Sequence, residues 1–518
     1  MKRQLGSLHR RSGVRGLCFA VLIGSLTLVT ACGGNSTGSA GEAGTSPSTS
    51  KVDEKPVPIS IVISNTYKYP DGMDDSNNPY INYIKQNTNL DIKAIVPPAD
   101  GYNEKLNVIM ASGELPDMIK VGDPSWVVNY INQKALKPLN DSIDKYGADL
   151  KKLIPKEAWD SVTIDGKIYA IPSINKTQAM ELMWVRKDWL DRLGLQVPKT
   201  LDDYVAVAKA FAEQDPDGNG KKDTLGLLIG ENLNNTTPFF GAFGVQRRQW
   251  VDRGGQLVYS STLPEMKQAL QFLAGLYKDK IIDQEWALNK SQVVGQKVGS
   301  GKAGLYSGLW SARRGEILTN EQNDPNAKWV EAGFPIGKDG KSGTVAGNLI
   351  ATYNVVPVTS KNADSVVKML NFMVGKGYSD LLLGFENQIW TRDKDGKVVT
   401  NFEEHNKHVY RNSLTNIVTP SDRASYYVQL KSLGEQFNLE PNIEMINKVL
   451  METKFTGIPT ASMGKHSASL DKLENEYFTK IVLGISPIDT FDEFVAQWTK
   501  QGGAEMTKDV NDWYKAKK

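Results

Sequence analysis

The chain has 518 residues, more than one compact core usually holds, so we expect two or three domains or lobes. Its formal net charge is +2, and without residues 1–31 it has 56 basic against 59 acidic residues. This balance gives no electrostatic reason to expect a nucleic-acid partner. Cys18 and Cys32 are the only cysteines, so the sequence excludes a disulfide beyond residue 32.

The N-terminus predicts export followed by lipid attachment. Basic residues and no acidic ones precede an apolar run over 17–31, which is shorter than the about 20 apolar residues that span a bilayer. The run ends in Val29-Thr-Ala-Cys32, which resembles the bacterial lipobox. We therefore expect residues 1–31 to be a lipoprotein signal peptide and Cys32 to carry lipid. The alternative is an ordinary signal peptide that is cut nearby.

Residues 32–56 are expected to form the lipidated cysteine and a flexible linker. The stretch 33–50 is nearly all Gly, Ser, Thr, Ala and Asn, a composition that cannot bury apolar surface. The folded body is then expected over 57–518.

The first part of that body alternates predicted strands and helices, which favours βαβ units and a mostly parallel sheet. Ligands bind beyond the carboxyl ends of such strands. This rule selects Asn65 and Tyr67 after the first strand, and Asp123 and Trp126 after the third. The predicted elements are strands over 59–64, 90–96 and 118–121, with helices over 80–87 and 103–111.

Later segments show turn and capping signals. Asp165-Gly-Lys167 between apolar flanks predicts a hairpin, because Gly supplies the positive φ of a tight turn. Thr200 with Asp203, and Thr490 with Glu493, resemble capping boxes. Further predicted elements are a strand over 182–185 and helices over 186–193, 201–213, 264–278, 363–374, 442–451 and 469–483.

Most catalytic signatures are missing from the sequence. No Walker-type loop, HExxH motif or Cys-His cluster is present, and the expected body over 57–518 has no G-x-S-x-G elbow. His405 and His408 stand among charged and amide residues, which indicates a solvated surface rather than a metal site. A glycosidase needs only two suitably spaced carboxylates across a cleft, so that alternative stays open.

The loop over 215–223 has the oxygen-rich pattern of a calcium site. Asp215, Asp217, Asn219 and Asp223 occupy positions 1, 3, 5 and 9 of an EF-hand-like loop, and Lys221 would offer its backbone carbonyl at position 7. Position 12 lacks the usual Glu, which favours a structural ion over a sensor. The alternative is a plain Asp/Asn/Gly turn.

Tryptophans supply further ligand-binding candidates. Trp250 and Trp310 stand outside periodic apolar segments, and Arg313 follows Trp310 closely. Flat aromatic faces stack on sugar rings, and Arg can donate to hydroxyl or carboxyl groups. Core packing is the alternative for each tryptophan. Asn348 completes this set of candidates.

Several segments together carry a family resemblance. They are ASGELPDMI at 111–119, DGKIYAIP at 165–172, WVRKDWLDRLGLQVPKTLDDY at 184–204, DPDGNGKKD at 215–223 and the C-terminal stretch 478–514. They resemble family 1 of the extracellular solute-binding proteins of bacterial ABC importers. The resemblance is to the oligosaccharide-binding lipoproteins of the LipO and aldouronate types, which are related to alginate-binding proteins.

The resemblance implies a fold and a function. We expect an α/β, two-lobed type II periplasmic-binding-protein fold with a ligand cleft between the lobes. Lobe 1 would hold about 57–172 and a return after about 350, and lobe 2 would hold about 173–350 and the C-terminal helices. The resemblance also implies Ca²⁺ in the loop over 215–223, because alginate-binding relatives carry the ion there.

The expected function is capture of an oligosaccharide and its delivery to ABC permease subunits, without catalysis. The expected location is the extracellular face of the cytoplasmic membrane in a Gram-positive cell, with the protein anchored by its N-terminal lipid as a monomer. A surface-anchored, glycoside hydrolase-like enzyme is the alternative.

Overall fold

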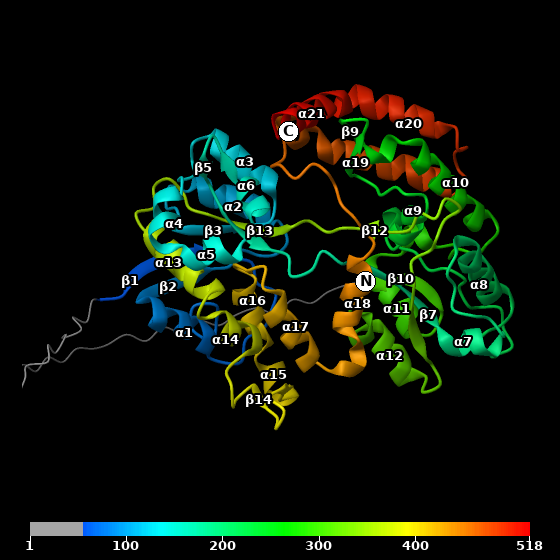
Figure 1. The fold of residues 1–518 in the computed structure, drawn as a ribbon, viewed down its shortest axis with the longest axis horizontal. Coiled ribbons are helices and arrows are strands. Elements are labelled where there is room, and N and C mark those ends of the chain that lie inside the picture. Colours follow the sequence, from blue (N-terminus) through cyan, green and yellow to red (C-terminus); the bar gives the residue numbers. More distant parts are fainter. Residues whose placement is uncertain (1–54, 518) are drawn as a thin grey trace, which may run out of the picture. The chain divides into compact units, whose positions relative to one another are not determined.

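Residues 55–517 are described by the structure, a computed structural model, and they contain two separate main β-sheets (Figure 1). The sheet of the first lobe has the strand order β2-β1-β3-β13-β6, and that of the second lobe has the order β10-β7-β11. The strands of the first sheet are β1 (Val57–Val62), β2 (Leu90–Ile95), β3 (Met118–Val121), β6 (Ile171–Ile174) and β13 (Ile350–Val355). The strands of the second sheet are β7 (Glu181–Arg186), β10 (Leu305–Leu309) and β11 (Trp329–Ala332).

The first three strands of lobe 1 follow the expected parallel arrangement, and β13 does not. Strand β1 pairs in parallel with β2 and β3, as the alternation of strands and helices predicts. Strand β13 is antiparallel to both β3 and β6, because the chain returns from lobe 2 between them. In lobe 2, β7 is antiparallel to both of its neighbours. The mostly parallel sheet predicted for the first part of the body is therefore confirmed for β1, β2 and β3, and β13 is the exception in that sheet.

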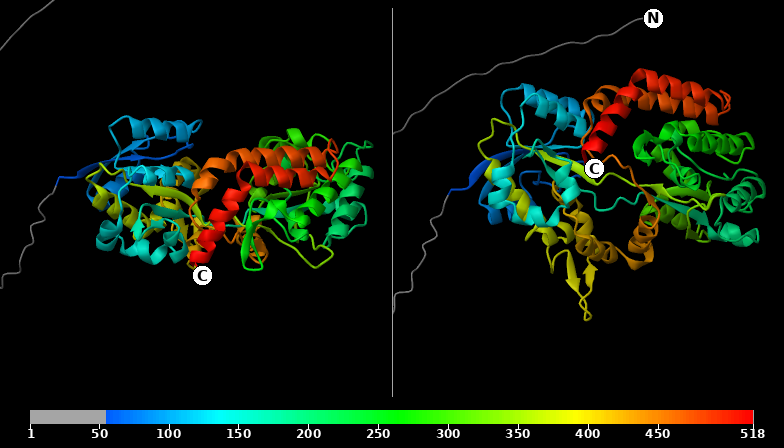
Figure 2. Two further views of the ribbon diagram at one scale, coloured as in Figure 1. Left: turned by 90° about the horizontal axis from the view of Figure 1, so that it is seen from above. Right: turned by 45° about the horizontal axis from the view of Figure 1, so that its top comes forward.

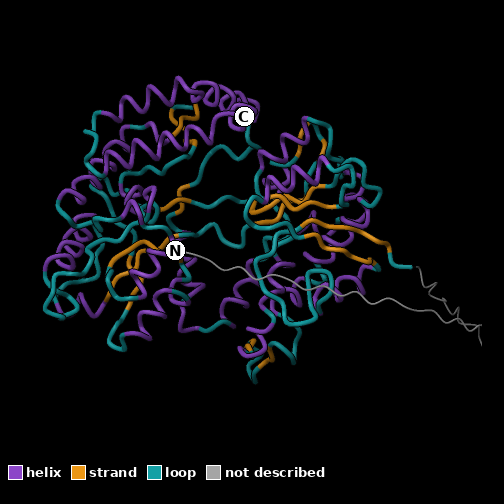
Figure 3. The backbone as a smooth tube through the Cα atoms, turned by 180° about the vertical axis from the view of Figure 1, so that it is seen from behind, coloured by secondary structure: helices purple, strands orange, loops and turns teal. Residues whose placement is uncertain are grey.

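Helices cover both sheets, as Figure 3 shows. Local sequence fixes several helix starts: Asn78 accepts hydrogen bonds from two backbone amides of α1, and Thr200 and Asp203 form the predicted capping box of α8. The helices of lobe 1 are α1 (Pro79–Thr88), α2 (Tyr102–Ala111), α3 (Pro124–Asn132), α4 (Asn140–Tyr146), α5 (Ala148–Leu153), α6 (Lys156–Asp160), α13 (Ala363–Val374), α14 (Tyr378–Leu383), α15 (Phe402–Lys407) and α16 (Asn412–Thr415).

Lobe 2 is enlarged by a layer of C-terminal helices. Figure 2 shows α19, α20 and α21 in orange to red beside the green segment that contains α10. The helices of lobe 2 are α7 (Lys187–Arg192), α8 (Leu201–Glu213), α9 (Thr237–Ala242), α10 (Pro264–Lys278), α11 (Ser291–Gly299), α12 (Glu316–Asn323), α17 (Arg423–Ser432), α18 (Leu439–Asn447), α19 (Ala461–Val482), α20 (Thr490–Trp498) and α21 (Ala504–Lys517).

Short strands complete the fold. The Asp165-Gly-Lys167 turn joins β4 and β5, so the predicted hairpin is confirmed. These strands are β4 (Thr163–Ile164), β5 (Lys167–Ile168), β8 (Trp250–Arg253), β9 (Gln256–Tyr259), β12 (Thr344–Val345), β14 (Trp390–Arg392), β15 (Val398–Thr400) and β16 (Leu450–Met451).

The chain passes between the lobes through three segments, residues 175–180, 346–349 and 420–425, which we call the crossings. The first two are hydrogen-bonded side by side, with Asn175 N donating to Leu349 O at 2.9 Å and Gly347 N donating to Gln178 O at 2.9 Å. The third crossing starts beside the first, because Ile174 N donates to Thr419 O at 2.9 Å. The three crossings therefore come together at one edge of lobe 1.

Some local expectations are wrong. Thr490 lies inside α20 rather than at its cap, and its hydroxyl donates to Pro487 O. The helix predicted over 442–451 ends at Asn447 and gives way to β16. His408 is buried rather than solvated. The hydroxyl groups of Tyr80 and Tyr410 lie 3.2 and 3.3 Å from its Nδ1, in place of water.

The predictions on the signal peptide, on Cys32 and on nearly all of the linker fall outside the described residues. Among residues 55–517, no helix has the length and apolar character that crossing a bilayer requires.

Candidate ligand-binding site

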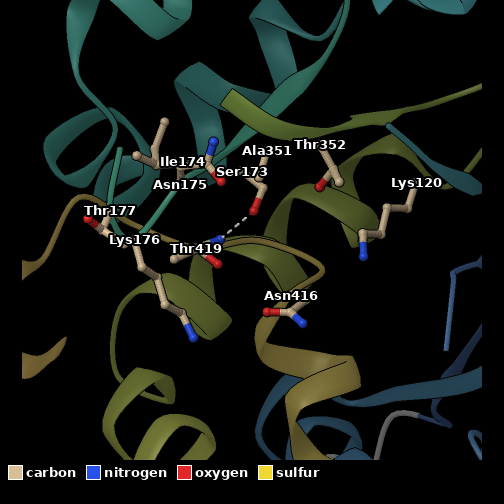
Figure 4. Close-up of a pocket in the computed structure, with 10 residues that line it drawn as sticks. All are labelled: Lys120, Ser173, Ile174, Asn175, Lys176, Thr177, Ala351, Thr352, Asn416 and Thr419. Carbon is tan, nitrogen blue, oxygen red and sulfur yellow. Dashed lines mark hydrogen bonds between the residues drawn. The ribbon is translucent and has the colours of Figure 1, made fainter. Parts of the chain in front are cut away.

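A cavity of about 390 Å³ lies where the crossings leave lobe 1 (Figure 4). It combines the carboxyl end of β3, the end of β6, the first crossing, the start of β13 and the chain after α16. The lining residues are Lys120, Ser173, Ile174, Asn175, Lys176, Thr177, Ala351, Thr352, Asn416 and Thr419. A site at this place can respond to movement of the lobes, because the first crossing forms one of its walls.

A second, smaller cavity of about 80 Å³ adjoins the first and shares Ile174 to Thr177 with it. Its other walls are Gln178, Leu349, Tyr378, the start of α17 and the stretch 420–423. All three crossings therefore contribute to the second cavity.

The lining of the larger cavity is rich in hydroxyl and amide groups. Thr419 N donates to Ser173 Oγ at 3.0 Å, which fixes one of these hydroxyls (Figure 4). Thr352 Oγ1 is buried and has no hydrogen-bond partner among the described residues. The side chain of Asn416 stands between Lys120 and Lys176 in the close-up. This chemistry suits a ligand with many hydroxyl groups, because each lining group can donate or accept a hydrogen bond.

Two lysines add positive charge to this lining. Burial lowers the pKa of Lys120 to about 8, and burial together with the charge of Arg411 lowers the pKa of Lys176 to about 8. None of the ten lining residues is an Asp or a Glu. The cavity therefore offers cationic and neutral polar groups to a ligand.

Residues predicted after the first and third strands lie close to the cavity without lining it. Asn65 Oδ1 accepts from Tyr67 N at 2.7 Å, and Asn65 Nδ2 donates to Asp75 Oδ1 at 2.9 Å, so this amide stabilises its own turn. Asp123 caps α3 by accepting from Ser125 N at 2.8 Å. Among the residues at the end of β3, the one that lines the candidate cavity is Lys120.

Two tryptophan candidates belong to the cores of the lobes. Trp126 is 5% exposed, donates to Asn107 Oδ1 at 2.9 Å and packs on Tyr130. Trp250 is 4% exposed and packs against Tyr259 and Trp498, which stack on each other. This corrects the expectation that their rings stack on a sugar, because neither ring presents a free face.

The other candidates also lie outside the cavities described above. Trp310 is half-buried, with its carbonyl accepting from Asn442 Nδ2 at 2.8 Å. Arg313 is occupied by Glu331 at 3.3 Å and by the Trp329 carbonyl. Asn348 is exposed, and its carbonyl accepts a hydrogen bond from the side chain of Asn175, which does line the cavity.

Sequence reasoning missed both lysines, although one signal was present. Lys120 is a charged residue inside Met118–Val121, a strand that is buried throughout. A charge at such a position needs a partner or a function, since burying it alone is costly.

The predicted calcium loop has its carboxylates around one amide. Asn219 Nδ2 donates to Asp217 Oδ2 at 2.8 Å and to Asp223 Oδ1 at 3.0 Å, and Gly220 N donates to Asp215 Oδ2 at 2.9 Å. Burial and a hydrogen bond with Asp215 raise the pKa of Asp217. Within residues 55–517, no three His, Cys, Asp or Glu side chains are grouped as a metal site.

The donor set of this loop still fits a hard cation. Its side chains offer carboxylate and amide oxygens, and Lys221 N donates to Asn219 Oδ1 at 2.8 Å within a tight turn. Position 12 is Gly226, where a Cβ would lie 2.3 Å from Ala208 O and 2.6 Å from Ile281 O. Packing therefore explains why the usual Glu is missing there.

The fold and the cavity define a class of protein: a two-lobed α/β binding protein whose polar site lies at the crossings between its lobes. A family model described as bacterial extracellular solute-binding protein matches residues 73–379, which is more than half of the chain. The chain belongs to this family, and the predicted family and fold class are thereby confirmed.

Individual relatives agree with this assignment. The chain is 27% identical over 453 residues to lipoprotein LipO of Bacillus subtilis, an alignment that covers 85% of this chain and 89% of LipO. It is 26% identical over 445 residues to the polygalacturonan/rhamnogalacturonan-binding protein YtcQ of the same organism, covering 83% and 86% of the two chains.

A solved structure shares the fold. The ABC-transporter substrate-binding protein FusA of Streptococcus pneumoniae, in complex with kestose, superposes with a TM-score of 0.70 at 19% identity. The match covers 89% of this chain and 99% of FusA.

Proposed function

We propose that this protein captures an oligosaccharide outside the cell and delivers it to the permease subunits of an ABC importer. The observation that carries this proposal is the cavity at the crossings, with its hydroxyl and amide lining, in a chain of the solute-binding family. The names of YtcQ and FusA support a saccharide as the ligand.

The proposed mechanism is a population shift between open and closed arrangements of the lobes. A ligand in the cavity contacts residues of the first crossing, such as Asn175, and residues of lobe 1, such as Thr352. It stabilises whichever arrangement lets it make more of these contacts, and only the closed one would dock on the permease. The hydrogen-bonded crossings would act as the hinge.

A glycosidase function is less well supported. Such an enzyme needs two carboxyl groups that flank the scissile bond, and none of the ten residues that line the larger cavity supplies one.

Incubation with oligosaccharides tests binding against catalysis. We expect saturable heat of binding with pectin, xylan or mannan fragments in calorimetry, and no new products after hours. Asn416→Ala should weaken binding at least about tenfold, because it removes lining hydrogen bonds. The matched control is Asn406→Ala, which changes an exposed asparagine of α15 that lines neither cavity. Formation of sugar products, or equal affinity of the Asn416→Ala variant, would contradict the proposal.

We also propose that the loop over 215–223 holds a structural Ca²⁺. Asp215, Asp217, Asn219 and Asp223 would supply side-chain oxygens, and Lys221 would supply its carbonyl. The ion would relieve the repulsion among carboxylates that the structure leaves around Asn219.

Chelation tests the calcium proposal. We expect EDTA to lower the melting temperature of the wild-type protein and excess Ca²⁺ to restore it, because a bound ion stabilises the folded state. EDTA should leave the melting temperature of Asp217→Ala unchanged, whereas Asp202→Ala, on exposed surface of α8, should respond like the wild type. An EDTA-insensitive wild-type protein would refute the site.

We further propose that Cys32 carries lipid and anchors the protein, as a monomer, to the outer face of the cytoplasmic membrane of a Gram-positive cell. Confinement to one membrane surface would raise the effective concentration of binder and permease for each other. Cys32→Ala should release the protein into the medium and impair uptake, while sugar affinity stays intact. Retention of the variant on cells would argue against this anchor.

A further inference from the structure

Two ammonium groups converge on the larger cavity from different elements. Lys120 extends from the carboxyl end of β3, and Lys176 extends from the first crossing (Figure 4). In the close-up they lie on opposite sides of the cavity, with Asn416 between them.

Neither lysine has a carboxylate partner within residues 55–517. Lys120 is 6% exposed, and its Nζ donates to Ser64 Oγ at 3.2 Å. The Nζ of Lys176 lies 5.9 Å from the centre of the Tyr426 ring, a cation–π contact. Neither of the two forms an ion pair with a described Asp or Glu.

The surroundings add positive charge instead of balancing it. Arg411 is 1% exposed and donates to the backbone carbonyls of Leu382 and His408. The carboxylate of Asp422 lines the adjoining cavity but caps α17, where it accepts from Ser425 N and Ser425 Oγ.

Lys120 is buried and Lys176 is half-buried, and a cation withdrawn from water without a carboxylate partner is costly for a fold. Transferring an ammonium group out of water disfavours its charged form, and the lowered pKa values of both lysines reflect this cost. A titratable group that lines a cavity and has a strongly shifted pKa is a candidate functional group. Apolar residues of similar size would stabilise the protein better.

We propose that this cavity selects an anionic oligosaccharide, with an acidic group of the sugar lying between Lys120 and Lys176. The inference rests on the proposed function and names the substrate class of the same site. Carboxylate and sulfate groups share the chemistry that the lysines would recognise, since both accept charge-assisted hydrogen bonds. The hydroxyl and amide lining would bind the remainder of the sugar.

Matched sugars test the charge preference. The probes are trigalacturonic acid, its trimethyl ester and a sulfated carrageenan oligosaccharide, titrated into the full-length protein at pH 7. We expect one of the acidic probes to bind about 10- to 100-fold more tightly than the ester, the range expected for losing charged hydrogen bonds. Tighter binding of the carrageenan fragment than of trigalacturonate would identify sulfate as the acidic group.

Failure of this inference is distinguishable from failure of the proposed function. Equal or tighter binding of the ester would overturn the charge preference and leave sugar capture standing. Binding of none of the three sugars would count against both this inference and the sugar-capture function that it presupposes.

Two variants separate a ligand-binding role from a structural one. Lys120→Met and Lys176→Met should lower affinity for the acidic sugar about 10- to 100-fold, change affinity for the ester less than about threefold, and raise the melting temperature of the free protein. Lys209→Met, on the exposed face of α8, is the control and should change none of these values. A lower melting temperature in both lysine variants, with affinity for the acidic sugar unchanged, would show that the lysines serve the fold instead.

Discussion

Buried basic side chains occur in two kinds of surroundings in this protein. In lobe 2, Arg186 is 2% exposed and donates to both carboxylate oxygens of Asp188, at 2.8 and 2.7 Å, and to Asp324 at 3.2 Å. In the cavity, Lys120 is 6% exposed and reaches only the hydroxyl of Ser64. Arg186 is thus neutralised by carboxylates of its own lobe, whereas Lys120 has no described carboxylate partner.

A second arginine cluster follows the pattern of Arg186. Glu474 of α19 is fully buried, and its Oε1 accepts from Arg247 Nε at 2.9 Å and from Arg248 Nε at 3.1 Å. This cluster ties the C-terminal helices to the chain after α9. Carboxylate pairing therefore distinguishes Arg186, Arg247 and Arg248 from Lys120, whereas the buried Arg411 is held by backbone carbonyls instead.

The largest effect is expected from breaking the Glu474 cluster. Glu474→Gln removes the charge shared by two arginines and should lower the free energy of unfolding by about 3–5 kcal/mol. Urea denaturation measures this loss in the free energy of unfolding. Glu476→Gln, on the same helix but with its pair to Lys480 in solvent, should leave stability unchanged. A Glu474→Gln loss below about 1 kcal/mol would mean that this buried pair contributes little.

A smaller effect is expected at Arg186. Asp188→Asn removes the charge of an ion pair that two hydrogen bonds hold. It should lower the free energy of unfolding, measured by urea denaturation, by about 1.5–3 kcal/mol. The matched control is Asp191→Asn, one turn along α7, where the carboxylate is 60% exposed and pairs with Lys187. If both variants lose the same stability, the buried ion pair contributes no more than the exposed one, which would contradict this prediction.

The sequence predicts this protein well where the signals are local. The helices over 201–213, 264–278 and 363–374 match α8, α10 and α13 at both ends. A capping box starts α8, Pro264 occupies the first turn of α10, and apolar periodicity marks the buried face of each helix, all of which neighbouring residues determine. The first sheet was predicted through β1, β2 and β3 for the same reason.

Long-range pairing explains what the sequence does not reveal. Strand β13 joins the first sheet 229 residues after β3 ends, and nothing near Ile350 shows that its neighbours are β3 and β6. The site depends on the same pairing, because Lys120, Lys176 and Thr352 meet only after β13 and the crossings are in place. Tryptophans outside periodic apolar segments were predicted to bind ligand, yet Trp126 and Trp250 are core residues.

The pH dependence of stability tests the unpaired lysines. Their pKa values are about 8 in the folded protein, against an ordinary 10.5. Between these values the unfolded chain holds protons that the folded protein has lost. Stability should therefore rise with pH from about 8 to 10.5, by up to about 1.4 kcal/mol per pH unit for each lysine.

Urea denaturation at several pH values compares the wild type with the Lys120→Met, Lys176→Met double variant. The double variant should lack the rise in stability that the two lysines cause. Other ionisable groups near Lys176 are Arg411, Asp422, Arg423, Tyr378 and Tyr426, and those near Lys120 are Tyr102, Tyr353 and Asp123. Burial raises the pKa of each of these four tyrosines above the ordinary 10, so they lower stability near the top of the window, and they do so in both proteins. A wild-type stability curve parallel to that of the double variant would show that the lysines titrate normally.

The smallest effect is expected at the outer partner of Arg186. Asp324 is 42% exposed, so water screens its 3.2 Å contact with the guanidinium, while Asp188 keeps both of its bonds. Asp324→Asn should cost under about 1 kcal/mol, and 1 M NaCl should reduce the difference further. If Asp324→Asn costs as much as Asp188→Asn, Arg186 needs both carboxylates to remain buried. Arg186 would then depend on two carboxylates, and Lys120 and Lys176, which pair with no described carboxylate, would differ from it still more.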